Sequence, residues 1–164
     1  PEPSLAQQTE KAIELLGSKN RGSNKGFFLQ VEGASIDKRA HASDPCGQIG
    51  ELVAFDKAVK VALDYARERG DTQVMVTGDH SHTPQIIEDD SNPPGFASRL
   101  TTKEGQVETI SYGTGRTPSS QEHTGAQIRI AAEGPGAVNV LGLIDDTDQY
   151  DIMAGALGAN RGRD

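Results

Sequence analysis

The chain has 164 residues, of which 24 are Asp or Glu and 16 are Lys or Arg, so its formal net charge is −8. An acidic surface repels nucleic-acid backbones, and no apolar run approaches the ~20 residues of a membrane span, so neither nucleic acid nor membrane is expected as a partner. Hydrophobic residues make up 34% and aromatic residues 4% of the chain, which is lean for a self-contained domain and would suit a piece of a larger fold.

The N-terminal stretch predicts a helix, a loop and a strand in that order. The helix runs from about Leu5 to Leu16, and Gly17 is expected to end it. Residues Asn20 to Gly26 are rich in Gly, Ser, Asn and Lys and predict a loop. The apolar run Phe27–Val31 predicts a buried strand, whose carboxyl end delivers Glu32.

The next part of the chain predicts a second helix and a second strand. Residues 34–46 fit neither pattern clearly. Residues Glu51 to Arg69 carry an apolar stripe with helical spacing, and Gly70 closes that helix. Gln73–Thr77 predicts a short strand. A strand, a helix and a strand in succession indicate an α/β fold, with part of a mainly parallel sheet flanked by helices.

The C-terminal half shows weaker patterns. Three short stretches predict strands: 106–111, 128–132 and 138–143. Asp146 or Thr147 can cap a last helix that runs through about Leu157. The length of the chain favours one domain over residues 1–164.

All four histidines lie in three short segments that also carry carboxylates: Val31–His41, Thr77–His82 and Gln121–Gly125. Together these segments offer Glu32, Asp37, His41, Asp79, His80, His82 and His123. Mixed imidazole and carboxylate sets are typical of catalytic zinc sites and of two-metal hydrolytic sites. A structural zinc would more often use cysteine, and this chain has one cysteine, Cys46.

The predicted fold places several of these groups together. Open α/β sheets bind ligands outside the carboxyl ends of their strands, and Glu32 and Asp79–His80 each follow a predicted strand. Asp37 and His41 are four residues apart, so a helical turn would put them on one face. His123 must come back to this edge by a loop. The alternative for each histidine is an ordinary hydrogen-bonded residue.

The segment VEGASIDKRAH, with NKGFFLQ before it and DPCGQIGE after it, resembles the bacterial alkaline phosphatase family. TGDHSH and SQEHTGAQIRIAAEGP match later motifs of that family in the same order. The resemblance runs from about Leu5 to Leu157. It implies an alkaline-phosphatase-like α/β fold and hydrolysis of phosphate monoesters, with two Zn²⁺ and one Mg²⁺ as cofactors.

The resemblance also implies a role for each candidate residue. Asp37, His41 and His123 would hold the first zinc. Asp79 and His80 would hold the second zinc, and Glu32 would be the magnesium ligand on this chain.

Two further residues would support the reaction. His82 would support Asp37 without binding metal itself. Lys38 would reach the phosphate, or the magnesium, through water, and the alternative for Lys38 is a solvated surface lysine.

Other parts of the family pattern are missing. The family's serine nucleophile lies in an Asp-Ser-Ala motif, which this sequence lacks. Also absent are the family's aspartate that bridges the second zinc and the magnesium, and its arginine that binds the phosphate. The resemblance therefore implies that residues 1–164 are the C-terminal part of an alkaline phosphatase catalytic domain, inactive without an N-terminal half. In relatives the cysteine equivalent to Cys46 pairs with an earlier cysteine; a buried free thiol is the alternative.

The resemblance further implies a homodimer in the periplasm or outside the cell. Two functions from other classes stay open. One is a non-catalytic metal-binding protein, and the other is a related diesterase or sulfatase that uses the same metal scaffold.

Overall fold

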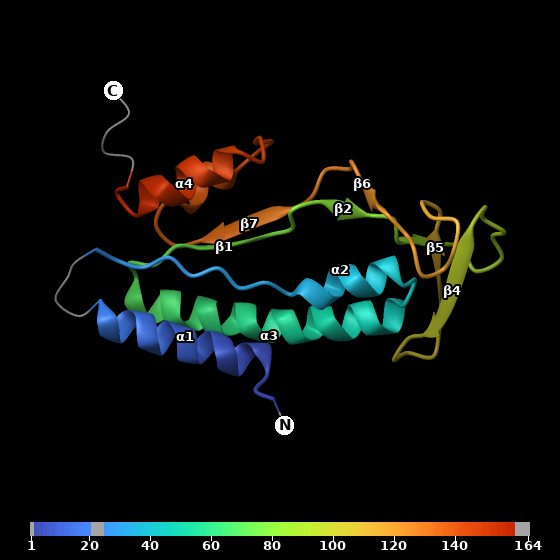
Figure 1. Cartoon of the computed structure of the whole chain (residues 1–164), viewed down its shortest axis with the longest axis horizontal. Coiled ribbons are helices and arrows are strands. Elements are labelled where there is room, and N and C mark those ends of the chain that lie inside the picture. The colour runs from blue at the N-terminus through green and yellow to red at the C-terminus, as the bar shows by residue number, and fades with distance from the viewer. Residues whose placement is uncertain (1, 21–24, 160–164) are drawn as a thin grey trace. The chain divides into compact units, whose positions relative to one another are not determined.

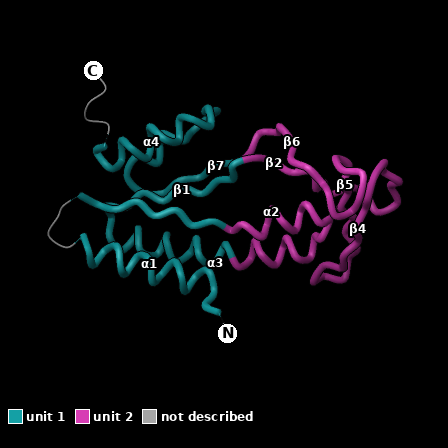
Figure 2. The backbone as a smooth tube through the Cα atoms, viewed as in Figure 1, with its two compact units in different colours: residues 1–32, 55–79, 129–164 teal, residues 33–54, 80–128 magenta. Residues whose placement is uncertain are grey.

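The computed structural model describes residues 2–20 and 25–159 (Figure 1). The chain forms two compact units, shown in different colours in Figure 2. Unit 1 comprises residues 1–32, 55–79 and 129–164, and unit 2 comprises residues 33–54 and 80–128. In the described part of the chain, no helix is both long enough and apolar enough to cross a membrane.

Unit 1 begins with α1, Leu5–Lys19. Ser4 caps this helix through a reciprocal capping box with Gln7, which satisfies N–H groups that the first turn leaves unpaired. The prediction that Gly17 ends the helix is wrong. The helix passes through Gly17 to Lys19, because a single glycine is tolerated in a last turn that the Asn20 N–H closes onto Leu16 O.

Residues 25–33, just before the next helix, form no strand. Along residues 27–32 half-buried and exposed side chains alternate, and Phe28 is 53% exposed, whereas the apolar run predicts a buried segment. This segment joins no ladder in the described structure, so the strand predicted for Phe27–Val31 is wrong for this chain. A strand requires a hydrogen-bonded neighbour, and an apolar run does not supply one. Of the loop predicted for Asn20 to Gly26, residues 21–24 lie outside the described residues.

The ambiguous stretch 34–46 becomes helical. Residues Ala34–His41 form α2, and Pro45–Arg69 form α3, which contributes to both units. The predicted helix 51–69 is therefore confirmed, but it starts six residues earlier. Proline suits the first helical position, since its missing N–H has no helical partner there. Gly70, with φ of +70°, ends α3 as predicted.

The remaining strands of unit 1 form one antiparallel pair. β1, Val74–Thr77, pairs with β7, Ile130–Glu133, with Val74 opposite Glu133. The strand predicted for 138–143 is wrong. A 3₁₀ helix, Ala137–Val140, stands there instead, because Gly136 at φ +79° turns the chain into a helical start. The last predicted helix is confirmed as α4, Asp148–Ala156, with Thr147 at its N-cap.

Unit 2 holds five short strands in two sheets. β2, Ser81–His82, pairs with β6, His123–Thr124. The second sheet has the order β3-β5-β4, made of Gln85–Ile87, Val107–Tyr112 and Phe96–Thr101. β5 was predicted, whereas the other four strands were not. The buried residues Thr109, Ile110 and Tyr112 place the centre of this sheet's packing on β5.

The α/β class holds, but the predicted parallel pairing does not. Each ladder in residues 2–20 and 25–159 is antiparallel. β1 finds its partner in β7, which returns after a long connection and runs in the opposite direction. The segment that was expected to pair in parallel with β1 forms no ladder in this chain.

Candidate metal centre

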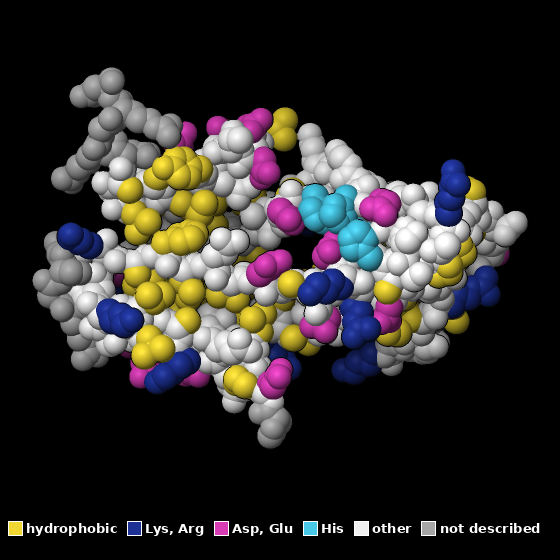
Figure 3. Space-filling view, viewed as in Figure 1, with side chains coloured by type: hydrophobic (Ala, Val, Ile, Leu, Met, Phe, Trp, Pro, Cys, Tyr) yellow, Lys and Arg dark blue, Asp and Glu magenta, His cyan; other side chains and the backbone are white. Residues whose placement is uncertain are grey.

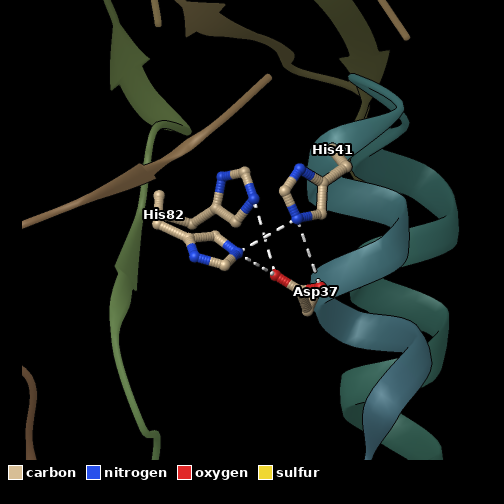
Figure 4. A group of neighbouring side chains, drawn as sticks. Asp37, His41 and His82 are labelled. Atoms are coloured by element: carbon tan, nitrogen blue, oxygen red, sulfur yellow. Dashed lines mark hydrogen bonds and ion pairs between the residues drawn. The ribbon is translucent and has the colours of Figure 1, made fainter. Parts of the chain in front are cut away.

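The helix α2 presents two of the candidate ligands side by side. Asp37 and His41 project from the same face of α2 toward His82 (Figure 4). His41 Nε2 lies 3.4 Å from Asp37 Oδ2. Ala40, between them in sequence, is fully buried. The i, i+4 spacing on a helix thus brings a carboxylate and an imidazole together, as the sequence predicted.

The short β2–β6 ladder supplies the opposite wall of the cluster. Its register sets His82 directly across from His123. His123 Nε2 lies 3.2 Å from Asp37 Oδ1 and 3.0 Å from His41 Nε2. Figure 3 shows histidine side chains gathered on one face of the molecule with acidic side chains beside them.

His80 completes the group of imidazoles around Asp37. Its ring stacks on that of His123 with centroids 3.5 Å apart and planes 20° from parallel. Its Nε2 lies 3.9 Å from Asp37 Oδ1. One carboxylate of unit 2 is therefore approached by a ring nitrogen of each of the four histidines, at 3.2 to 3.9 Å.

The spacing of three of these groups fits a tetrahedral zinc ion. With bonds of about 2.0 Å, ligand atoms of such an ion lie about 3.3 Å apart. The two imidazole Nε2 atoms of His41 and His123 are 3.0 Å apart, and each approaches a different oxygen of Asp37, at 3.4 Å (Oδ2) and 3.2 Å (Oδ1). A set of two imidazoles and one carboxylate is also the chemistry of a catalytic zinc site, which keeps one position open. The donor set therefore fits the metal.

Hydrogen bonds assign opposite tautomers to His41 and His82. His41 Nδ1 contacts the backbone carbonyl of Gln121. A carbonyl only accepts, so His41 Nδ1 carries the proton and Nε2 presents its lone pair to the cluster. At His82 the Thr83 N–H donates to Nδ1 at 2.9 Å. In neutral His82 the proton therefore sits on Nε2, which faces Asp37 Oδ1 at 3.6 Å.

These tautomers distinguish His41 from His82. The same rule places a proton on His123 Nε2, which lies 3.2 Å from Asp37 Oδ1, and His123 would have to give up that proton to bind a metal. A histidine ligand must offer an unprotonated nitrogen, and His41 does so. His80 follows the same pattern, because its Nδ1 lies 3.2 Å from the Ser81 carbonyl. His82 instead points an N–H at the carboxylate, as a residue that orients Asp37 would. Burial lowers the pKa of His82 below its ordinary value, and nearby His41 adds to that effect, so His82 is neutral at pH 7.

Other predicted residues lie outside this cluster. Glu32 and Asp79 are exposed and belong to unit 1, so the geometry of unit 2 does not test their roles, which stay predictions. Lys38 is exposed on α2, and its role also stays a prediction. Cys46 is an exposed free thiol in this chain, so the buried-thiol alternative is wrong.

Sequence reasoning missed Gln121. This residue is fully buried, and its backbone carbonyl accepts from the ring of His41. The one feature of the sequence that could have pointed to a role for Gln121 is its position two residues before His123. That position does not indicate a contact with a histidine 80 residues earlier.

Comparisons with known proteins agree on one family. A family model described as alkaline phosphatase matches residues 1–119. The chain is 58% identical over 156 residues to an alkaline phosphatase of Escherichia coli K12, covering 95% of this chain and 32% of that protein. It is 55% identical to alkaline phosphatase H of Pseudomonas aeruginosa, covering 94% of this chain and 32% of that protein. It is 48% identical to streptomycin-6-phosphate phosphatase of Streptomyces griseus, covering 95% of this chain and 35% of that protein.

The solved structures that resemble this chain are also alkaline phosphatases. The alkaline phosphatase from the Antarctic bacterium TAB5 superposes with a TM-score of 0.70 at 25% identity, over 96% of this chain and 41% of that chain. A mutant of that enzyme with Mg bound in its M3 site gives 0.71, also at 25% identity, over 96% of this chain and 42% of that chain. The chain spans about a third of the length of the curated relatives named above. With its motifs, its fold and the match over residues 1–119 in agreement, the chain belongs to the alkaline phosphatase family.

Proposed function

We propose that this chain is the C-terminal part of the catalytic domain of a metal-dependent alkaline phosphatase and supplies most of its metal ligands. The observation that carries the proposal is the convergence of Asp37 and His41, both on α2, with His123 on β6, with the contacting ring nitrogens and carboxylate oxygens 3.0 to 3.4 Å apart. The substrate class is phosphate monoesters. Membership in the family and the name of the Streptomyces griseus relative, a streptomycin-6-phosphate phosphatase, support that class.

The cofactors proposed are two Zn²⁺ and one Mg²⁺. Asp37, His41 and His123 would hold the first zinc, Asp79 and His80 the second, and Glu32 the magnesium. When bound, such ions polarise phosphoryl oxygens and lower the pKa of water, and Mg²⁺ prefers the hard oxygen ligand that Glu32 offers.

Two groups of the chain itself would support these ligands. His82 Nε2 lies 3.6 Å from Asp37 Oδ1, beyond hydrogen-bond distance in the described structure, and its proposed role is to orient that carboxylate. The Gln121 carbonyl keeps the proton of His41 on Nδ1, so that Nε2 faces the cluster.

Lys38 stands beside Asp37 on α2 with its side chain exposed. Its ammonium would attract the anionic substrate, directly or through water.

Turnover is proposed to require a second polypeptide segment. The sequence has no Asp-Ser-Ala motif to supply a nucleophile. The missing groups would come from the N-terminal part of the same enzyme, and the complete enzyme would be a homodimer in the periplasm or outside the cell. The bacterial origin of the relatives named above supports that location.

Complementation tests the proposal. The chain would be mixed with the N-terminal two thirds of the Escherichia coli relative, with Zn²⁺ and Mg²⁺, and assayed with p-nitrophenyl phosphate. Hydrolysis that appears in the mixture, stops with chelator and fails with Asp37→Asn is the expected result. Hydrolysis by the chain alone would contradict the fragment assignment. Stoichiometric zinc uptake with no turnover in the mixture would favour the non-catalytic metal-binding alternative.

A further inference from the structure

Gln121 has the strongest polar anchoring of any side chain near the metal cluster. The residue is fully buried, with 0% of its surface exposed. Its Oε1 accepts from the backbone N–H groups of Thr114 and Gly115 at 3.2 and 3.1 Å. Its Nε2 donates to the carbonyl of Thr117 at 2.8 Å. One amide therefore closes the loop of residues 113–121 upon itself.

The backbone of Gln121 is joined to His41 at two points. The Gln121 N–H donates to the His41 carbonyl at 3.0 Å. The Gln121 carbonyl accepts from His41 Nδ1. The first bond holds the two backbones together, and the second holds the ring. A ligand on α2 is thus oriented by a residue that is distant in sequence and that sits two positions before another ligand, His123.

Other contacts hold the two sides of this loop together alongside the amide. At Gly115 an added Cβ would lie 1.9 Å from the Ser120 carbonyl, so the two sides of the loop are in close contact. The Thr114 hydroxyl accepts from the Glu122 N–H at 2.8 Å and donates to the Glu122 carbonyl at 3.0 Å. The Ser43 hydroxyl donates to the Pro118 carbonyl at 2.7 Å and ties the same loop to the turn after α2.

The chemistry at this position requires an amide. Two N–H groups need an acceptor and one carbonyl needs a donor, all inside a buried site. Leucine offers neither function, and glutamate cannot donate to the Thr117 carbonyl. Without the amide, the loop would relax toward solvent to satisfy its three backbone groups, and the carbonyl that accepts from His41 would move with it.

We propose that Gln121 is a positioning residue of the metal site. Its side chain fixes the 113–121 loop, so that its own carbonyl keeps His41 as the Nδ1–H tautomer with Nε2 aimed at Asp37 and His123. The consequence for metal affinity rests on the proposed function, whereas the tautomer does not. Groups that orient a metal-bound histidine in this way typically contribute about 10- to 100-fold to affinity.

The first test needs neither metal nor substrate. Long-range ¹H–¹⁵N NMR of the metal-free 164-residue chain reports which ring nitrogen carries the proton, at about pH 8.5, well above the ordinary imidazole pKa. The wild-type chain is expected to show His41 as Nδ1–H and His82 as Nε2–H. Gln121→Leu is expected to shift His41 toward Nε2–H, the form that a solvated imidazole prefers. Gln127→Leu, which changes an exposed glutamine six residues later, is the matched control and should leave both signals unchanged.

The second test measures metal binding by the visible spectrum of Co²⁺. Gln121→Leu is expected to weaken Co²⁺ binding by about 10- to 100-fold, while Gln127→Leu binds as the wild type does. A Gln121→Leu chain that keeps the His41 tautomer, or that binds Co²⁺ with wild-type affinity, would overturn the proposal.

A milder variant covers the case in which Gln121→Leu does not fold. Thr114→Val removes the hydroxyl that clamps Glu122 and leaves the buried amide in place. It is expected to fold and to lose part of the Co²⁺ affinity, and an unchanged affinity would count against the loop's role. Neither readout uses phosphatase turnover, so a failure to hydrolyse phosphate esters sinks the proposed function without affecting this result.

Discussion

The fully buried Tyr112 offers a sharp test of the packing of unit 2. Its side chain is 0% exposed, and its hydroxyl has no hydrogen-bond partner in the described structure. Leaving a buried hydroxyl unpaired costs about 1 to 3 kcal/mol. Tyr112→Phe removes the hydroxyl and keeps the ring, so it is expected to raise the free energy of unfolding at pH 7 by about 1 kcal/mol.

The same residue predicts a pH dependence. Burial, with Asp44 and Cys46 adding to it, raises the pKa of Tyr112 to about 12. The unfolded chain has the ordinary pKa of about 10, so between these values it releases a proton that the folded chain retains. Stability from this group is therefore fully present below about pH 10 and is lost as pH rises toward 12. Two pKa units correspond to about 2.7 kcal/mol at most.

Urea unfolding followed by circular dichroism measures both effects. The stability difference between Tyr112→Phe and the wild type should widen as pH rises from about 10 toward 12, because phenylalanine has nothing to ionise. Tyr150→Phe, at a position that is 60% exposed, is the matched control and should change little at either pH. If Tyr112→Phe destabilises the chain at pH 7 by 1 kcal/mol or more, the hydroxyl has a partner and the reasoning is refuted.

Three further predictions concern the metal cluster and its support. His82→Ala is expected to weaken Co²⁺ binding by about 10- to 100-fold, and Asp37→Asn to weaken it more, because in the proposed site Asp37 would bind the metal directly and His82 would only orient it. Calorimetric titration measures both affinities, with Asp146→Asn as the control. If His82→Ala weakens binding more than Asp37→Asn does, the two proposed roles are exchanged. Removing bound metal with a chelator should lower the thermal unfolding midpoint of the wild type but not that of Asp37→Asn, because a metal that binds only the folded state stabilises it. An equal shift of the midpoint in both chains would contradict the site. Ala40→Leu overpacks a fully buried position on α2 and should lower the free energy of unfolding, measured with urea, by about 1 to 3 kcal/mol. Ala42→Leu, at an exposed position, is the control and should leave that free energy unchanged. Equal effects of the two substitutions would mean that α2 is not anchored through Ala40.

Local signals in the sequence predicted three of the four α-helices of the described chain, α1, α3 and α4, and left the stretch that forms α2 ambiguous. The apolar stripe predicted α3, and glycine in a left-handed conformation ends it at Gly70 as expected. These signals predicted the ends of helices less reliably: α3 begins at Pro45, six residues before the predicted start, and α1 continues past Gly17 to Lys19. Such boundaries depend on a few hydrogen bonds in the first and last turns, and these respond to neighbours that a linear pattern does not contain.

The strands were harder to predict because pairing is a tertiary property. β2 and β6 have two residues each, too few for any alternation to appear in the sequence. The run Phe27–Val31 is apolar enough to predict a strand but joins no ladder in the described chain. β1 pairs with a strand that lies more than 50 residues away, and it pairs in the direction opposite to the one predicted. Apolar pattern specifies which face is buried, whereas register and direction depend on the partner.

The sequence by itself determined the family, the inventory of candidate ligands and the pairing of Asp37 with His41, because these follow from motifs and from helical spacing. Only the tertiary structure decided which histidines offer a lone pair and which offers a proton. That distinction depends on the Gln121 carbonyl and the Thr83 N–H, single backbone groups whose positions are set by folding. One ring hydrogen bond fixes the tautomer of an imidazole, and residues 80 positions apart meet only once the loop and α2 have packed together.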